Sequence, residues 1–227
     1  MNKKSLGDRQ TEQSLNNLSE FEGAKLLAGY GIPTAKAMLA HDWEAVKRAG
    51  KTIGYPVVLK LSSSEISHKT EKGVVAVDLH NEADLELAFN RIREASAIAK
   101  PEYLVQEMVK GGRELVVGMV RDTQFGPCVM FGLGGIFTEI LGDVVFRPAP
   151  LSERDAAKML QEIKGNKILD RVRGMPAVNR ESLIGCLMAV GKIGLERADI
   201  MAIDINPLIV RQGKPVAVDA LVVLRQI

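Results

Sequence analysis

His68, one of three histidines in the chain, lies in a polar, hydroxyl-rich segment at residues 62–73. Lys60 precedes it closely, and Lys69 and Lys72 follow it. Basic side chains, hydroxyl groups and a free loop backbone are what the binding of a phosphate requires. The segment is therefore either a phosphate-handling loop or an ordinary solvated hairpin loop, and its residue types alone do not decide between the two.

A second polar group lies near the C-terminus, where Asp204 and Asn206 alternate with apolar residues and share one face of a predicted strand. A two- or four-residue hairpin loop centred on residues 212–213 would place Asn206 opposite Asp219, with Cβ atoms about 5 Å apart. Two carboxylates and an amide oxygen suit Mg²⁺ held jointly with nucleotide phosphates, and grouping them without a cation would be costly. The alternative is a set of solvated residues on an exposed face, and a three- or five-residue loop would break the pairing.

Two familiar phosphate motifs fail here. Residues 50–52 read Gly-Lys-Thr, as at the end of a P-loop, but Ala45 stands where that motif needs a glycine. Residues 132–137 begin like a dinucleotide fingerprint, but Phe137 occupies the third glycine position and a strand is predicted after it instead of a helix. The glycines would still allow a close approach of backbone to a ligand.

Capping signals and apolar periodicity predict the elements that would position these groups. Helix caps are expected at Ser19, Asp42, Asn81, Ser152 and Asn179. Strands are expected at 56–61, 74–79, 103–109, 114–121, 127–131, 137–141, 144–147, 200–210 and 215–223. After a disordered tail at residues 1–14, the chain is predicted to form two α+β lobes, the first about 15–104 and the second about 105–227.

The composition supports a globular core and gives no argument for a nucleic-acid or membrane surface. The chain is 46% hydrophobic, and its net charge of +2 is too balanced for a nucleic-acid surface. No apolar run approaches the roughly 20 residues of a membrane span, and the N-terminus lacks the apolar region of a signal peptide. We therefore expect a cytoplasmic protein. Cys128 and Cys186 stand far apart, which argues against a structural zinc site and a disulfide.

Several motifs, taken together and in order, resemble the ATP-grasp (beta) subunit of the ADP-forming acetyl-CoA and acyl-CoA synthetases, relatives of succinyl-CoA synthetase. They include Ser-His-Lys-Thr-Glu-Lys-Gly at 67–73, Gly-Leu-Gly-Gly-Ile-Phe-Thr-Glu at 132–139 and Ile-Asp-Ile-Asn-Pro-Leu at 203–208. The other matching segments are 22–27, 30–33, 55–60, 105–108, 112–118 and 147–151. The resemblance extends over nearly everything from residue 15 onward, and the set is far more specific than any single motif.

The resemblance implies an α+β ATP-grasp fold, with ATP or ADP bound between two lobes. In that family pattern, Lys60 matches the lysine that reaches the nucleotide phosphates, and Glu114 matches the glutamate on the ribose side. The segment that contacts adenine is matched by Gln106, Glu107 and Met108. The Mg²⁺ ligands are matched by Asn206 and Asp219, while Asp204 matches a neighbouring acidic position.

His68 matches the catalytic histidine of this branch, which takes a phosphoryl group from a phosphohistidine on the partner subunit and passes it to Mg-ADP. Unprotonated imidazole is a suitable nucleophile near neutral pH. Many relatives have a second glycine after Gly73, where this chain has Val74. The family's CoA-binding domains do not fit within 227 residues, so a separate alpha subunit is implied, in an α2β2 assembly.

Two other functions remain open. One is a stand-alone ATP-grasp carboxylate ligase that makes an acyl-phosphate itself, although such a ligase has no use for a histidine relay. The other is a non-catalytic regulatory subunit, for which loss of Lys60, His68 or the metal pair would have been the signal. The sequence does not reveal the acyl group, which would bind to the partner.

Overall fold

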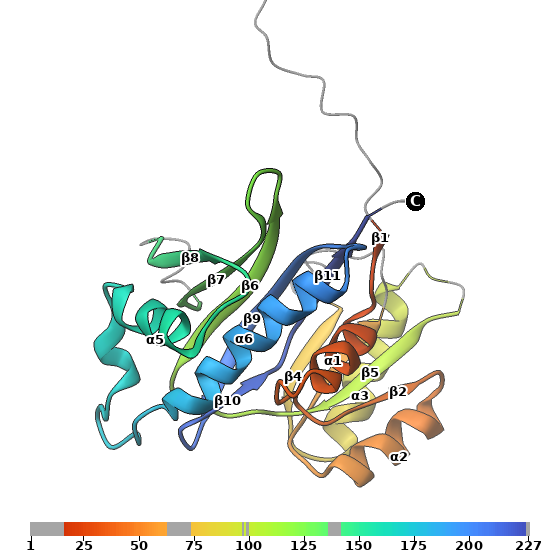
Figure 1. The fold of residues 1–227 in the computed structure, drawn as a ribbon. Coiled ribbons are helices and arrows are strands. Elements are labelled where there is room, and N and C mark those ends of the chain that lie inside the picture. The colour runs from red at the N-terminus through yellow and green to blue at the C-terminus, as the bar shows by residue number, and fades with distance from the viewer. Residues whose placement is uncertain (1–15, 63–73, 97, 99, 136–141, 226–227) are drawn as a thin grey trace, which may run out of the picture.

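The computed structural model describes residues 16–62, 74–96, 98, 100–135 and 142–225, whose strands form two antiparallel sheets (Figure 1). The smaller sheet has the order β2 (Ala37–Ala40), β5 (Glu102–Glu107), β3 (Val57–Ser62) and β4 (Val75–Leu79). The larger sheet has the order β1 (Asn16–Asn17), β11 (Leu221–Leu224), β9 (Ile200–Arg211), β6 (Glu114–Asp122), β7 (Gly126–Leu133) and β8 (Val144–Pro148). A further strand, β10 (Lys214–Ala217), also pairs with β9.

The described α-helices begin where the sequence predicts, whereas the short 3₁₀ helix at Asn166–Leu169 was not predicted. The described helices are α1 (Glu20–Gly29), α2 (Trp43–Ile53), α3 (Glu82–Ala95), α5 (Glu153–Glu162), the 3₁₀ helix η1 (Asn166–Leu169) and α6 (Arg180–Glu196). Each of the five predicted cap residues accepts a hydrogen bond from the backbone N–H three positions later, and Ser19 and Ser152 form complete capping boxes. The Gly-Lys-Thr segment at 50–52 lies inside α2 and so is not the strand-to-helix loop that a P-loop requires.

Each sheet has its own apolar core. Val57, Leu59 and Leu61 of β3 are fully buried, in the core that the smaller sheet forms with α2 and α3. On the larger sheet, α6 packs against β6 and β7, and α5 packs beside it (Figure 1). Side chains alternate between the two faces of a strand, and these helices cover one face of each sheet. They leave the other face of each sheet uncovered. Lys60 lies on that second face of β3.

The residues around α1 pack with the larger sheet although they come first in the chain. Leu27 and Ile32 belong to its core, and β1 pairs with β11. Helix α1 nevertheless also contacts β2, so it lies where the two sheets meet. The predicted first lobe therefore contains an N-terminal part that packs on the other sheet. The predicted tail, residues 1–14, lies outside the described residues.

The C-terminal hairpin follows the prediction except for one interruption. The strand expected at 215–223 is divided into β10 and β11, with residues 218–220 outside the ladder. The interruption faces Pro207, which has no N–H to donate, although its carbonyl accepts from Val218 N–H at 3.3 Å. The strand expected at 144–147 is confirmed as β8, whereas the one expected at 137–141 falls on residues that the structure does not describe.

Among the described helices, none combines the length and the hydropathy that crossing a membrane requires.

Candidate active site

The polar segment predicted to handle phosphate connects two paired strands. Strands β3 and β4 are antiparallel neighbours, and Leu61 N–H donates to the carbonyl of Val74 at 3.0 Å. Both ends of the segment are therefore held at one end of the smaller sheet. His68, with Lys69 and Lys72, lies outside the described residues, so its role as a catalytic residue stays a prediction.

The hairpin between β9 and β10 has the two-residue loop that the carboxylate prediction requires. Gln212 and Gly213 both have positive φ, as a tight hairpin turn needs. The register pairs Leu208 with Ala217 on β10 and Asp204 with Leu221 on β11. Continuing either pairing by counting residues brings Asn206 opposite Asp219, which is the predicted arrangement.

The electrostatics of this group agree with the predicted cation site. Asp204, Asn206 and Asp219 are all solvent-accessible, whereas Ile203 and Ile205 are buried on the opposite face. Removal from bulk water, and secondly the charge of Asp219, raise the pKa of Asp204. Two carboxylates that repel each other beside an amide oxygen fit Mg²⁺, which prefers oxygen ligands and retains waters and substrate phosphates. Among the described residues, no group of three or more His, Cys, Asp or Glu is placed to hold a metal ion.

Lys60 connects the smaller sheet to this group. Its Nζ donates to Glu20 Oε1 at 2.5 Å and to the carbonyl oxygen of Val218, the neighbour of Asp219, at 3.0 Å. Lys60 is 8% exposed and Glu20 is 5% exposed, so this ion pair is buried. An ammonium group has three donors, and the contacts of the described residues use two of them. Among the described contacts, the third N–H of Lys60 has no acceptor.

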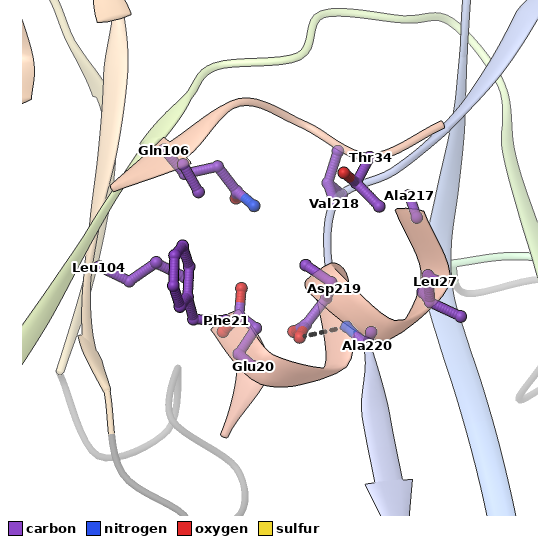
Figure 2. Close-up of a pocket in the computed structure, with 12 residues that line it drawn as sticks. Glu20, Phe21, Leu27, Thr34, Leu104, Gln106, Ala217, Val218, Asp219 and Ala220 are labelled. Atoms are coloured by element: carbon purple, nitrogen blue, oxygen red, sulfur yellow. Dashed lines mark hydrogen bonds between the residues drawn. The ribbon is translucent and has the colours of Figure 1, made fainter. Parts of the chain in front are cut away.

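A pocket lies beside this ion pair, between α1, β5 and residues 217–220 (Figure 2). Its empty volume is about 270 Å³, a figure that includes space open to solvent. Figure 2 shows Gln106 entering from the smaller sheet and Glu20 and Asp219 from the opposite wall, where Asp219 Oδ1 accepts from Ala220 N–H at 2.8 Å. Phe21 forms part of the apolar lining. The structure thus places Gln106 and Asp219 of the predicted site on one pocket. Lys60 does not line this pocket, but it bonds to two residues that do, Glu20 and Val218.

The predicted adenine-contacting segment lies at the end of β5. Gln106 is buried, and Met108 N–H donates to the carbonyl of Pro56 at 3.1 Å. The Glu107 carboxylate is already engaged, since it accepts from Lys36 N–H at 3.0 Å and from Arg211 Nη1 at 2.8 Å. Burial alone would raise the pKa of Glu107, but these two hydrogen bonds outweigh it and hold the pKa below its usual value.

Glu114 begins β6, is exposed, and is not among the residues that line the pocket. Its carbonyl accepts from Gly134 N–H at 2.8 Å. A Cβ on Gly134 would come within 2.9 Å of the Glu114 carbonyl carbon, and one on Gly135 within 2.9 Å of the Glu114 carboxylate. Gly134 and Gly135 therefore allow the backbone to pack against Glu114. Their approach to a ligand stays a prediction.

Sequence reasoning missed two residues that contact the site. Glu20 follows a helix N-cap, where an acidic residue is explained by the helix dipole alone. Arg211 precedes a hairpin turn, where a basic residue needs no special explanation. Neither position carried a local signal, because the contacts of both lie in other segments, at Lys60 and Glu107 respectively. To predict either contact, one would first have to know which segments of the two sheets lie side by side.

Comparison with known proteins agrees with this geometry. The ATP-grasp domain family matches residues 9–224. The chain is 44% identical over 213 residues to the acetate–CoA ligase [ADP-forming] I subunit beta of Pyrococcus furiosus, with 91% of each chain covered.

Two solved structures of an acetyl-coenzyme A synthetase from Ca. Korarchaeum cryptofilum are also similar, each at 40% identity over 92% of this chain. One, a complex with coenzyme A, Ca-AMPCP and HgCl⁺, has a TM-score of 0.88 and is covered over 94% of its length. The other, a complex with coenzyme A and Mg-AMPPCP in which the phosphohistidine segment points towards the nucleotide-binding site, has a TM-score of 0.82 and is covered over 93%. The predicted family and fold are confirmed: this chain belongs to the ATP-grasp family and, within it, to the beta subunits of the ADP-forming acyl-CoA synthetases.

Proposed function

We propose that this chain binds Mg-ADP between its two sheets and completes the reaction acyl-CoA + ADP + phosphate ⇌ carboxylic acid + ATP + CoA. The observation that carries the proposal is the contact of Lys60 with the carbonyl of Val218. It places the lysine predicted to bind phosphate next to Asp219, a predicted metal ligand, although the two are far apart in the chain. A carboxylate group on the pocket and a lysine bonded to its wall supply both charges that a magnesium–nucleotide complex requires.

Each predicted residue has a distinct task in this scheme. Lys60 donates to phosphate oxygens with its remaining N–H, while residues 106–108 hold the base and Glu114 the ribose. Asp219 and Asn206, together with Asp204, would hold the magnesium ion. When bound, that ion would neutralise charge on the phosphates during transfer.

His68 is the proposed phosphoryl carrier. In the direction of ATP synthesis, the P–N bond of phosphorylated His68 breaks while an oxygen of the ADP β-phosphate forms a new P–O bond. In the reverse direction, the unprotonated imidazole nitrogen attacks the γ-phosphorus of ATP, and ADP leaves. The imidazole is regenerated in the first direction and phosphorylated in the second, so each transfer breaks one bond to phosphorus and forms one.

The proposed partner is a CoA-binding alpha subunit that carries its own phosphohistidine. The name of the Pyrococcus furiosus relative, a subunit beta, supports a partner of this kind. We propose an α2β2 assembly. The acyl group would bind to the partner, and acetate is the acid named for that relative.

Reverse phosphorylation tests this function without the partner. The purified chain is incubated with Mg²⁺ and γ-labelled ATP, and label that is stable in alkali but lost in acid is measured on the protein. We expect the wild-type chain and His80→Asn to be labelled, because His80 is exposed and paired with Asp78 away from the pocket. His68→Asn should remain unlabelled.

Two results would contradict the proposal. Equal labelling of His68→Asn and wild type would exclude His68 as the carrier. Formation of acyl-phosphate from a carboxylic acid and ATP by the chain alone would instead identify a stand-alone ligase.

A further inference from the structure

The segment at residues 33–36, between α1 and β2, is bonded to both sheets. On the side of the larger sheet, the carbonyl of Pro33 accepts from Ala217 N–H at 2.8 Å, and Ala35 N–H donates to the Ala217 carbonyl at 2.9 Å. On the side of the smaller sheet, the Lys36 carbonyl accepts from Glu107 N–H at 2.9 Å. The end of β5 is therefore fixed to the larger sheet through this short segment.

The Glu107 side chain strengthens the same junction. Its Oε1 accepts from Lys36 N–H, and its Oε2 accepts from Nη1 of Arg211, the last residue of β9. One carboxylate thus joins the N-terminal segment, the smaller sheet and the larger sheet. The Glu107 side chain is only 19% exposed, whereas Arg211 is 41% exposed. Solvent reaches the arginine end of the contact more than the glutamate end.

A small apolar core lies beside this contact. Ala35, Val109 and Val216 are buried together, with Ile209 and Val218 packed against them. These residues come from the same three parts of the chain that Glu107 joins. The junction is therefore a packed and hydrogen-bonded unit, and residues 106–108 form its edge towards the smaller sheet.

We propose that Arg211 is a positioning residue for the nucleotide base, acting through Glu107. By holding the Glu107 carboxylate, it fixes residues 106–108 relative to the larger sheet, which carries the residues proposed to bind magnesium. Base and phosphates are then held at a constant separation. This inference rests on the proposed function, because it assigns base recognition to residues 106–108.

The test replaces Arg211 with glutamine, which keeps a polar side chain and removes the charge. Binding of Mg-ADP to the full chain is measured by calorimetry, and binding of Mg-GDP by its competition with Mg-ADP. We expect the dissociation constant for ADP to rise about fivefold, the scale of a half-exposed ion pair. The dissociation constant for GDP should change much less. ADP and GDP carry the same phosphates, but their bases make different contacts. The preference for ADP over GDP should therefore fall.

Three further variants separate positioning from general support of the fold. Arg211→Lys should restore most of the ADP affinity, because only one N–H···O bond from Arg211 to Glu107 is involved. In a Glu107→Gln background, Arg211→Gln should have little additional effect, as expected for residues acting through one contact. Arg197→Gln is the matched control, since Arg197 forms an exposed ion pair with Asp199 at the other end of β9. It should bind both nucleotides as wild type does.

The outcomes distinguish this inference from the proposed function. Failure of the wild-type chain to bind Mg-ADP would refute the function itself. Binding by wild type, with an unchanged ratio of the ADP and GDP constants in Arg211→Gln, would refute only the role of Arg211. Equal weakening of both nucleotides would also refute it, because it would show that Arg211 supports the fold without positioning the base.

Discussion

The buried ion pair between Lys60 and Glu20 predicts that one substitution will damage stability and nucleotide binding for separable reasons. Lys60→Met keeps an unbranched side chain of similar length but removes the charged ammonium group. The Glu20 side chain, 4% exposed, then loses the positive charge of Lys60 at a buried position. The carbonyl of Val218 loses the same donor.

The expected cost follows from this burial. Removing one partner of a buried pair costs about 3–5 kcal/mol. For a domain of this size, about 3 kcal/mol corresponds to a fall in the unfolding temperature of roughly 6–12 °C. Lys192→Met is the matched control, because the Lys192–Glu196 pair has both side chains at least half exposed, at 64% and 50%. An exposed pair of this kind contributes about 0.5 kcal/mol or less.

A second substitution separates stability from binding. Glu20→Gln combined with Lys60→Met removes both charges, and replacing a buried pair completely is often nearly neutral. We therefore expect the double variant to regain most of the unfolding temperature lost in Lys60→Met. Its affinity for Mg-ADP should remain low, because the donor proposed to contact the phosphates is still missing.

Thermal unfolding followed by circular dichroism, with calorimetry of Mg-ADP binding, checks both parts. If Lys60→Met unfolds within about 1 °C of wild type, on the scale of 2–4 °C per kcal/mol, the pair is not a buried one in solution. If the double variant binds Mg-ADP as tightly as wild type, Lys60 does not contact the phosphates.

Three further predictions concern the metal group, the junction and the glycine segment. Asp219→Ala should lose Mg-ADP binding in calorimetry with little change in unfolding temperature, and an unchanged affinity would exclude it as a ligand. The lowered pKa of Glu107 stabilises the fold above the ordinary glutamate pKa of about 4 and ceases to do so as the pH falls through the folded value. Glu107→Gln should therefore lose less stability than wild type between about pH 5 and 3, and parallel unfolding curves would contradict this. Gly134→Ala should lower the free energy of unfolding in urea by about 1–3 kcal/mol, because the new Cβ would meet the backbone of Glu114. Gly185→Ala on α6 is the control. Nothing lies within 4 Å of its new Cβ, so it should be neutral or stabilising by up to about 1 kcal/mol.

Local signals were sufficient for much of the fold. The helix caps at Ser19, Asp42 and Asn81 could be predicted because a cap depends on a side chain and a backbone group three residues apart. The register of the C-terminal hairpin was equally local, since a two-residue turn determines which residues pair. From that register alone, the sequence predicted that Asn206 and Asp219 lie opposite each other.

Other features depended on contacts that no local pattern contains. The packing of residues 18–32 on the larger sheet follows from a surface formed some 180 residues later in the chain, at β9 and β11. The interruption of the last strand needed knowledge of which residue faced Pro207. Glu20 and Arg211 were missed for the same reason, although their partners Lys60 and Glu107 had both been identified from the family resemblance.

The two missed residues have a common physical meaning. Glu20 lies on α1, which packs on the larger sheet, and Arg211 lies on β9 of that sheet. Each binds a site residue on the smaller sheet. Together they connect the two sheets between which the nucleotide is proposed to lie. Lys60 bonds to Glu20 and Val218, while Glu107 bonds to Arg211.

Motion of one sheet relative to the other would have to stretch or break these bonds. The groups proposed to bind the nucleotide therefore also hold the two sheets together, and binding should reduce the relative motion of the sheets. Slower hydrogen exchange at residues 106–108 and 218–220 on addition of Mg-ADP is the expected sign of that coupling. Faster exchange there would show that the nucleotide separates the sheets.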